Sequence, residues 1–220
     1  MSLTAARARA SNASRGGLSA VKTGALGFAL AVAVAAATTF ASTSTAFAGT
    51  VERPKAPNAL HSVWVFQTVC VNPMPSTSAL EKMAKQFGFK PVTGKALQGF
   101  APQAKPEYLK AWAFPDHARV FRVAVAISAV DAELGKNFPA YAKGKATGCT
   151  VVLPAKDKPA MVTAGMQQLL ERKPDETYPA GPFKVNVWIN EARGNVLLVY
   201  HYAPANGKPG GLISLVTLTK

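Results

Sequence analysis

Acidic residues are scarce in this chain and are missing from its N-terminal part. The 220 residues hold 11 Asp and Glu against 25 Lys and Arg, and no acidic residue precedes Glu52. Arg7, Arg9, Arg15 and Lys22 are therefore unopposed. Such a cationic stretch is typical of the n-region of a secretory signal, which stays on the cytoplasmic side of the membrane.

Long apolar runs are also lacking. The Ala-rich run at 25–37 falls short of the roughly 20 residues that a membrane-spanning helix needs, but it suits the h-region of a signal peptide. Small and hydroxylated residues follow and close on Ala46-Phe47-Ala48, an A-x-A cleavage pattern. We predict a signal peptide over 1–48, cleaved between Ala48 and Gly49. The alternative is an uncleaved N-terminal anchor helix.

Signals for other export routes are absent. No cysteine follows the A-x-A pattern, which leaves a lipoprotein anchor unsupported, and Arg7-Ala-Arg9 lacks the paired arginines of a twin-arginine signal. The mature chain, 49–220, is predicted to be a single exported domain without a membrane span, located in the periplasm or the medium.

Cysteine is rare, since Cys70 and Cys149 are the only two. Neither lies in a C-x-x-C or Cys-His pattern, which argues against a reactive nucleophile or a metal ligand. In an oxidising compartment the pair predicts a disulfide. Closing a loop of about 80 residues would stabilise the fold by about 4–5 kcal/mol on the chain-entropy model.

Catalytic motifs are missing as well. The sequence has no G-x-S-x-G, no H-E-x-x-H, no Walker-type loop and no G-x-G-x-x-G after a predicted strand. His61, His117 and His201 stand far apart and share no ligand spacing. The sequence therefore predicts no catalytic residue, no metal site and no cofactor.

The mature chain is strongly basic. Without the four basic residues of the leader, 21 Lys and Arg face 11 Asp and Glu, a net charge of +10. Such a surface favours acidic polymers. The lysines are scattered, however, and the densest group is Lys136, Lys143 and Lys145. A dispersed lysine surface also serves solubility alone. Nucleic acid is not favoured as a partner, because the chain is exported and its basic residues are not interleaved with aromatics.

A weak internal repeat predicts the fold. Two stretches, 66–70 and 146–149, read as strands that end at a cysteine, and each is followed by proline and then a helix, expected at about 77–87 and 159–172. Ser78 and Glu81 form a capping box for the first helix. After each helix comes a hairpin built around a tryptophan, and 109–126 aligns without gaps with 185–202.

A last apolar run at 212–218 adds a closing strand. The chain therefore predicts an α+β fold with two β-α-β-β pseudo-repeats, at about 60–130 and 145–220, and an extra C-terminal strand. The antiparallel sheet or sheets are expected to be covered by two helices. The joins at about 89–107 and 129–146 are expected to be loops, and the two cysteines are expected to occupy matching strands.

One pattern on the strands suggests a ligand platform. Alternation places Trp112 on the face of Lys110, and Trp188 on the face of Asn186 and Asn190. Exposed indoles beside amide side chains suit sugar or peptide recognition. The alternative is that each tryptophan is simply covered by a helix.

These observations favour a non-enzymatic binding or structural module of the envelope that engages an acidic polymer or a protein partner. The alternative is a hydrolase-like enzyme with its site between the two halves, using His201 or His117 with a nearby carboxylate.

Overall fold

The computed structural model describes residues 49–55, 58–74, 76–101, 105–192 and 194–220. The predicted leader, up to and including Ala48, lies outside the described residues. Within the described ranges no helix is long and apolar enough to cross a membrane. The fold is α+β, as predicted, with one eight-stranded antiparallel sheet and few helices.

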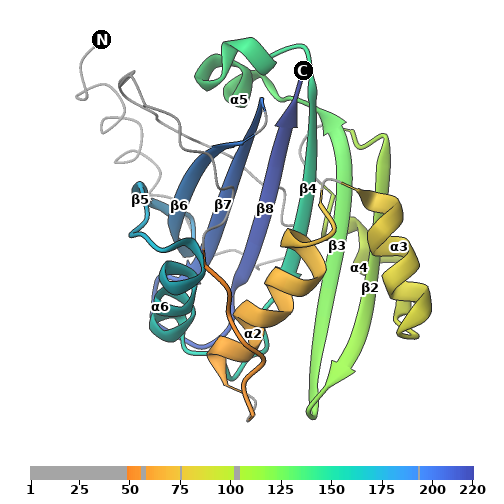
Figure 1. Ribbon diagram of the computed structural model, residues 1–220, viewed down its shortest axis with the longest axis vertical. Coiled ribbons are helices and arrows are strands. Elements are labelled where there is room, and N and C mark those ends of the chain that lie inside the picture. The colour runs from red at the N-terminus through yellow and green to blue at the C-terminus, as the bar shows by residue number, and fades with distance from the viewer. Residues whose placement is uncertain (1–48, 56–57, 75, 102–104, 193) are drawn as a thin grey trace, which may run out of the picture.

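The strands follow the order β1-β2-β3-β4-β8-β7-β6-β5 (Figure 1). Strands β1 to β4 are neighbours in sequence order, as are β5 to β8, and the two groups meet where β4 pairs with β8. The bounds are β1 Lys90–Val92, β2 Tyr108–Asp116, β3 Arg119–Ala129, β4 Lys145–Val152, β5 Glu176–Ala180, β6 Phe183–Ala192, β7 Asn195–Pro204 and β8 Leu212–Thr219.

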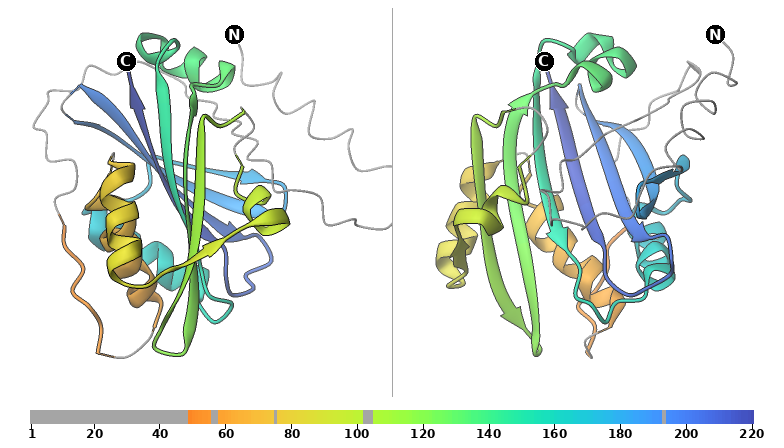
Figure 2. Two further views of the ribbon diagram at one scale, coloured as in Figure 1. Left: turned by 90° about the vertical axis from the view of Figure 1, so that its right-hand side faces the viewer. Right: turned by 180° about the vertical axis from the view of Figure 1, so that it is seen from behind.

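The helices are short and lie mainly on one face of the sheet. Their bounds are α2 Ala59–Phe66, the π-helix η2 Gln67–Val71, α3 Thr77–Gln86, α4 Gly94–Gln98, α5 Ala132–Asn137, the 3₁₀ helix η3 Pro139–Tyr141 and α6 Pro159–Leu170. Figures 1 and 2 show α2, α3 and α6 on the same face.

Local signals explain where two of these helices begin. The Ser76 hydroxyl accepts a hydrogen bond from the Ala79 amide at 3.2 Å and caps α3. Pro159 is the first residue of α6, where a missing N–H costs nothing. Along α6, Val162, Met166 and Leu169 are fully buried, which gives the helix its apolar stripe.

The main core lies between these helices and the sheet. Helices α2 and α6 approach closely because Gly165 has no side chain: a Cβ there would lie 2.9 Å from Leu60 Cδ2 and 3.0 Å from Val63 Cγ2. The sheet contributes the apolar side chains of its facing rows, among them Phe121, Val123, Val151, Trp188, Ile213 and Leu215.

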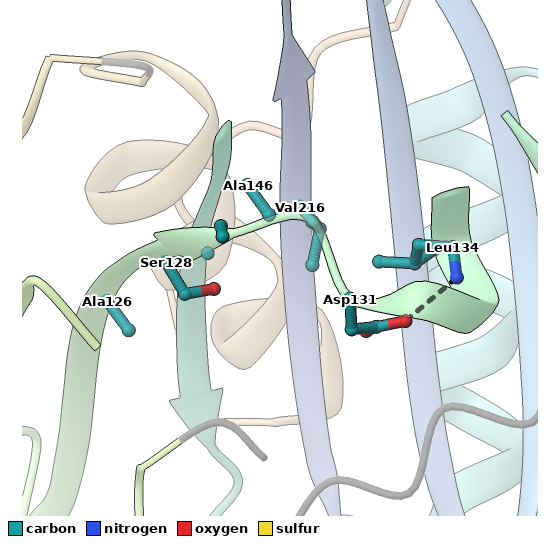
Figure 3. A pocket seen from close by; sticks show the side chains of 8 residues that line it. Ala126, Ser128, Asp131, Leu134, Ala146 and Val216 are labelled. Atoms are coloured by element: carbon teal, nitrogen blue, oxygen red, sulfur yellow. Dashed lines mark hydrogen bonds between the residues drawn. The ribbon is translucent and has the colours of Figure 1, made fainter. Parts of the chain in front are cut away.

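The opposite face carries a second, smaller core. Leu198, Tyr200 and Leu218 pack there with Leu134 of α5. Beside α5 is a cavity of about 70 Å³ whose polar lining is Ser128 and Asp131 (Figure 3). The Asp131 carboxylate already accepts hydrogen bonds from the Glu133 and Leu134 amides. This cavity is far smaller than the roughly 300–1,000 Å³ of small-molecule sites, so it is too small to be a candidate ligand site.

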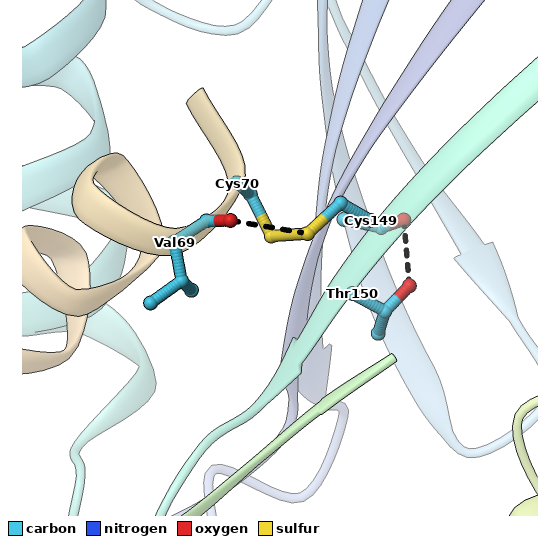
Figure 4. Close-up of a disulfide and its surroundings, with 5 residues drawn as sticks. Val69, Cys70, Cys149 and Thr150 are labelled. Carbon is cyan, nitrogen blue, oxygen red and sulfur yellow. Dashed lines mark hydrogen bonds between the residues drawn. A yellow bond between two sulfur atoms is a disulfide. The ribbon is translucent and has the colours of Figure 1, made fainter. Parts of the chain in front are cut away.

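The predicted disulfide is confirmed. Cys70 and Cys149 are bonded with a Cα–Cα distance of 5.5 Å and a sequence separation of 79 (Figure 4). Both cysteines are fully buried. The bond ties the end of the first helical segment to β4, one of the two central strands.

Several boundaries differ from the prediction. Residues 66–70, expected as a strand, form the end of α2 and the π-helix η2, so Cys70 is helical whereas Cys149 lies in a strand. The two cysteines therefore do not occupy matching strands. The N-cap of α3 is Ser76 rather than Ser78. The joins expected as loops contain β1 and α4 in the first case, and α5 and η3 in the second.

Candidate functional site

Both tryptophans of the predicted platform lie in the core. Trp112 is 8% exposed and Trp188 is 0% exposed, and both pack in the layer beneath the helices. The Trp188 indole N–H donates to the Arg172 carbonyl at 3.1 Å. Neither indole can form the exposed platform that the strand pattern predicts.

The polar residues expected beside the tryptophans are engaged elsewhere. Lys110 pairs with Glu81 of α3 at 2.9 Å. Asn186 accepts from the Thr177 hydroxyl at 2.9 Å, and Asn190 accepts from the Arg172 guanidinium at 2.8 Å. These contacts stabilise the packing of α3 and of the strands. They do not bring Lys110, Asn186 and Asn190 together on one ligand-binding surface.

His201, a residue of the hydrolase hypothesis, is enclosed under α6. Its side chain is 0% exposed, and Nδ1 lies 3.1 Å from the Thr163 hydroxyl. Nε2 has no hydrogen-bond partner among the described residues. Burial lowers the pKa of the imidazole to about 4, which keeps it neutral at neutral pH. Among the described residues His201 has no carboxylate partner, so the arrangement that the hydrolase hypothesis needs is not formed here.

The titratable residues that do converge lie at one end of the sheet. Four segments meet there: the β2–β3 turn, the start of α2, the β4–α6 loop around Asp157, and the β7–β8 loop at 205–211 (Figure 1). We call this region the hairpin end. Its turn residues His117 and Ala118 both have left-handed backbone, with φ of 47° and 58°.

Asp116 organises the exposed half of the hairpin end. Its carboxylate is 2.8 Å from His61 Nε2 and 3.1 Å from the Arg53 guanidinium. Arg53 also lies 3.3 Å from His117 Nε2, and its guanidinium stacks 5.0 Å from the Trp64 ring centre. His61 is completely buried, whereas Arg53 and His117 are exposed. The basic side chains of Arg53 and His117 are therefore exposed to solvent next to the Asp116 carboxylate.

Asp157 organises the buried half. Its carboxylate accepts from the Ser62 hydroxyl and from the Arg119 guanidinium, the latter at 2.6 Å. Arg119 also donates to the Asn58 carbonyl at 3.1 Å. The Asp157 carbonyl accepts from the Gly210 amide at 2.9 Å. One buried carboxylate residue thus joins α2, β3, the β4–α6 loop and the β7–β8 loop.

The charge left over at this end is positive. Both carboxylates are neutralised by arginines. Four exposed lysines lie within two residues of Arg53, Asp157 or Gly210 in the chain: Lys55, Lys156, Lys158 and Lys208. None of these four lysines forms an ion pair with any residue that the structure describes. The arrangement can attract and bind an anion.

The same geometry gives no support to acid–base catalysis. His117 Nε2 is 3.8 Å from the nearest Asp116 oxygen, beyond hydrogen-bond distance. His61 does bind Asp116, but it is sealed from solvent. Among the described residues no three His, Cys, Asp or Glu side chains are grouped to hold a metal ion.

Most residues of the hairpin end carry no local sequence signal. His61 and Asp116 are 55 residues apart, and Ser62 and Asp157 are 95 apart. His61 and His117 are considered from the sequence, but neither has a local pattern that pairs it with a carboxylate. No known family model matches this chain, no curated protein is similar to it, and no solved structure matches it.

Proposed function

We propose that this protein is an exported, non-enzymatic module of the envelope whose hairpin end binds acidic polymers. The observation that carries the proposal is the local charge balance. Asp116 and Asp157 are committed to Arg53 and Arg119, so the surrounding lysines present their charge to solvent without compensation.

Rigidity supports this assignment. Binding a polyanion with scattered lysines is weak when the side chains and loops must first be ordered. Here Asp157 ties the β4–α6 loop to Ser62 and Arg119, and its carbonyl ties the β7–β8 loop. The loops that carry Lys156, Lys158 and Lys208 are therefore fixed to one scaffold.

The rest of the surface adds a general positive field. Every lysine from Lys55 to Lys220 has an exposed side chain. Lys110 and Lys145 form ion pairs, with Glu81 and Glu107. Such a field attracts polyanions over the Debye length, roughly 8 Å at physiological salt. The hairpin end then provides the binding site.

We further propose that the sheet is a pseudo-twofold duplication. The palindromic strand order supports it, because a helical segment and four strands occur twice and meet at β4 and β8. Trp112 on β2 matches Trp188 on β6. The turns of the matching hairpins differ: the β6–β7 turn uses Gly194 at φ 75°, whereas the β2–β3 turn uses His117 and Ala118. These two turns lie at opposite ends of the sheet, as a twofold axis between β4 and β8 requires.

Binding of a polyuronate at low and high salt tests the function, with neutral dextran as the uncharged comparison. The triple variant Lys156→Gln, Lys158→Gln, Lys208→Gln should bind about tenfold more weakly, because three charges leave one rigid surface. Its matched control is Lys82→Gln, Lys85→Gln, Lys90→Gln on α3 and β1, which removes the same charge from another part of the surface.

The comparison of the two triple variants decides the outcome. Equal loss in both would mean that net charge alone binds the polymer, and the hairpin end would lose its role. Binding of dextran, or binding that survives high salt in the hairpin-end variant, would point to a different site. Absence of polyuronate binding by the unaltered protein would overturn the proposed function.

A further inference from the structure

Gly49, the residue after the predicted cleavage site, lies against the end of α6. A Cβ on Gly49 would lie 2.5 Å from the Gln168 carbonyl oxygen and 2.6 Å from that of Leu169, both in the last turn of α6. Backbone atoms cannot move aside as flexible side chains can. Only glycine therefore fits at this position.

The next residues are part of the core. Val51 is 4% exposed and packs in the main core. Its amide donates to the Gln67 side-chain oxygen at 3.0 Å. Figure 1 shows this segment, in orange, running along α6 and α2. Gly49 and Val51 are thus packed into the fold.

The end of α6 that Gly49 contacts carries a partial negative charge. The last carbonyls of a helix lack intrahelical partners and form the negative end of its dipole. Helix α6 has no basic residue in its last turn, and its C-cap residue is the acidic Glu171. A cation at this position would be stabilised.

The charged side chains near the C-terminus of α6 are engaged with other partners or exposed to solvent. Arg172 is turned to Asp175 and to Asn190 of β6, at 3.2 and 2.8 Å. On the elements packed against the segment, Gln67 of η2 is uncharged and His61 of α2 is bound to Asp116. Lys173, beyond the helix, is exposed. Within the segment itself, Arg53 is committed to Asp116 and Glu52 is exposed.

We propose, on the basis of the export proposed above, that hydrolysis of the Ala48–Gly49 bond creates an α-ammonium group that caps the C-terminus of α6. Water adds across the peptide bond: its hydroxyl goes to the Ala48 carbonyl carbon, a hydrogen goes to the Gly49 nitrogen, and the amine takes a further proton from solvent. Before cleavage the same nitrogen is a neutral amide.

Standard backbone dimensions limit the distance between this nitrogen and the two carbonyl oxygens. Nitrogen and Cβ of one residue are about 2.5 Å apart, so the Gly49 nitrogen lies within about 5 Å of both carbonyl oxygens. An ammonium group with three donors can reach them directly or through one water molecule. Cleavage thus converts a neutral amide within the chain into a charged cap at the C-terminus of α6.

The first test uses mature protein purified from the exported fraction of cells that make the full precursor. Mass spectrometry should give a chain beginning at Gly49. The pKa of its α-amino group, measured from the pH dependence of its labelling rate, should be raised from the usual range of about 7.7–8.0 to about 8.5–9, because the helix carbonyls favour the charged form.

A variant with Ser-Gln inserted between Ala48 and Gly49 supplies the control. It keeps the A-x-A pattern and Gly49, but it moves the ammonium group two residues away. A group whose pKa is raised by folding contributes stability below pH 8 that is lost as the pH rises through the folded value. Between pH 7.5 and 9.5 the natural protein should therefore lose about 2–4 °C of Tm more than the insertion variant.

The outcomes separate the two proposals. A precursor that is not exported would overturn the proposed location, and a chain that begins at another residue would overturn the cleavage site. A chain that begins at Gly49 with an α-amino pKa of about 7.7–8.0, or with the same pH response as the insertion variant, would overturn the cap while leaving export intact.

Discussion

At the residue scale, the tip of the β2–β3 hairpin is the most unusual feature. Two-residue hairpin turns favour Asn-Gly or Gly-Gly because both positions need left-handed backbone. Here His117 and Ala118 adopt it with φ of 47° and 58°. His117 has a contact that accounts for its side chain, since Nε2 lies 3.3 Å from Arg53. Ala118 is exposed and has only its methyl group to offer.

Ala118→Gly should therefore stabilise the protein by about 1 kcal/mol, because glycine adopts left-handed backbone without the steric cost that alanine bears. Urea unfolding followed by circular dichroism measures the change. The matched control is Ala160→Gly in the first turn of α6, where the backbone is helical and the same replacement should destabilise by about 0.5–1 kcal/mol. A loss of stability in both variants would contradict the idea of strain at the turn.

At the scale of elements, the sequence predicts those with a clean local signal. Helices α3 and α6, both tryptophan hairpins and β8 carry periodicity or turn residues, and they form nearly where expected. Strands β1 and β5 were not predicted because each contains a proline, Pro91 or Pro179. Proline is tolerated there because both are edge strands, which only the assembled sheet reveals.

Helix α2 was also not predicted from the sequence. Its sequence contains Val63 and Val65, and β-branched residues of this kind are typical of buried strands. It is helical because it packs on α6 at Gly165 and against the sheet, so tertiary contacts outweigh local propensity. The hairpin end could not be predicted either. Its hydrogen-bonded side chains are far apart in the sequence, and only the packing of α2 and α6 on the sheet brings them together.

A buried polar chain beneath α6 gives a pH response at this scale. His201 Nδ1 lies 3.1 Å from the Thr163 hydroxyl, which also contacts Asn186 at 3.4 Å. Burial lowers the folded-state pKa of His201 from 6.5 to about 4. The neutral imidazole therefore contributes stability above pH 6.5, and this stability is lost as the pH falls through 4.

The expected loss from this histidine is about 3 kcal/mol between pH 7 and pH 4. His201→Asn keeps a polar group near Thr163 but does not titrate, so it should lack this part of the acid sensitivity even if it is less stable at pH 7. The difference in unfolding free energy between natural protein and variant, measured at several pH values, isolates the contribution. A constant difference across this range would show that His201 does not titrate on unfolding.

At the scale of the whole molecule, one covalent bond links the helical layer to the sheet. Cys70 ends the first helical segment, Cys149 lies on β4, and the loop between them spans 79 residues. Both cysteines are part of the same core as α6 and β8, so apolar packing and the disulfide act on the same contact between layers. The bond restricts mainly the unfolded chain, because the folded chain is already held by that core.

Replacing both cysteines by serine should therefore lower stability by about 4–5 kcal/mol, or about 10–20 °C in Tm, while the native fold still forms. Chemical denaturation should also show a larger m-value for the variant, because an unfolded chain without the cross-link exposes more surface. Reductant should bring the natural protein close to the variant and leave the variant unchanged. If the variant unfolded completely at room temperature, the disulfide would be a requirement for packing the layers and not only a restraint on the unfolded chain.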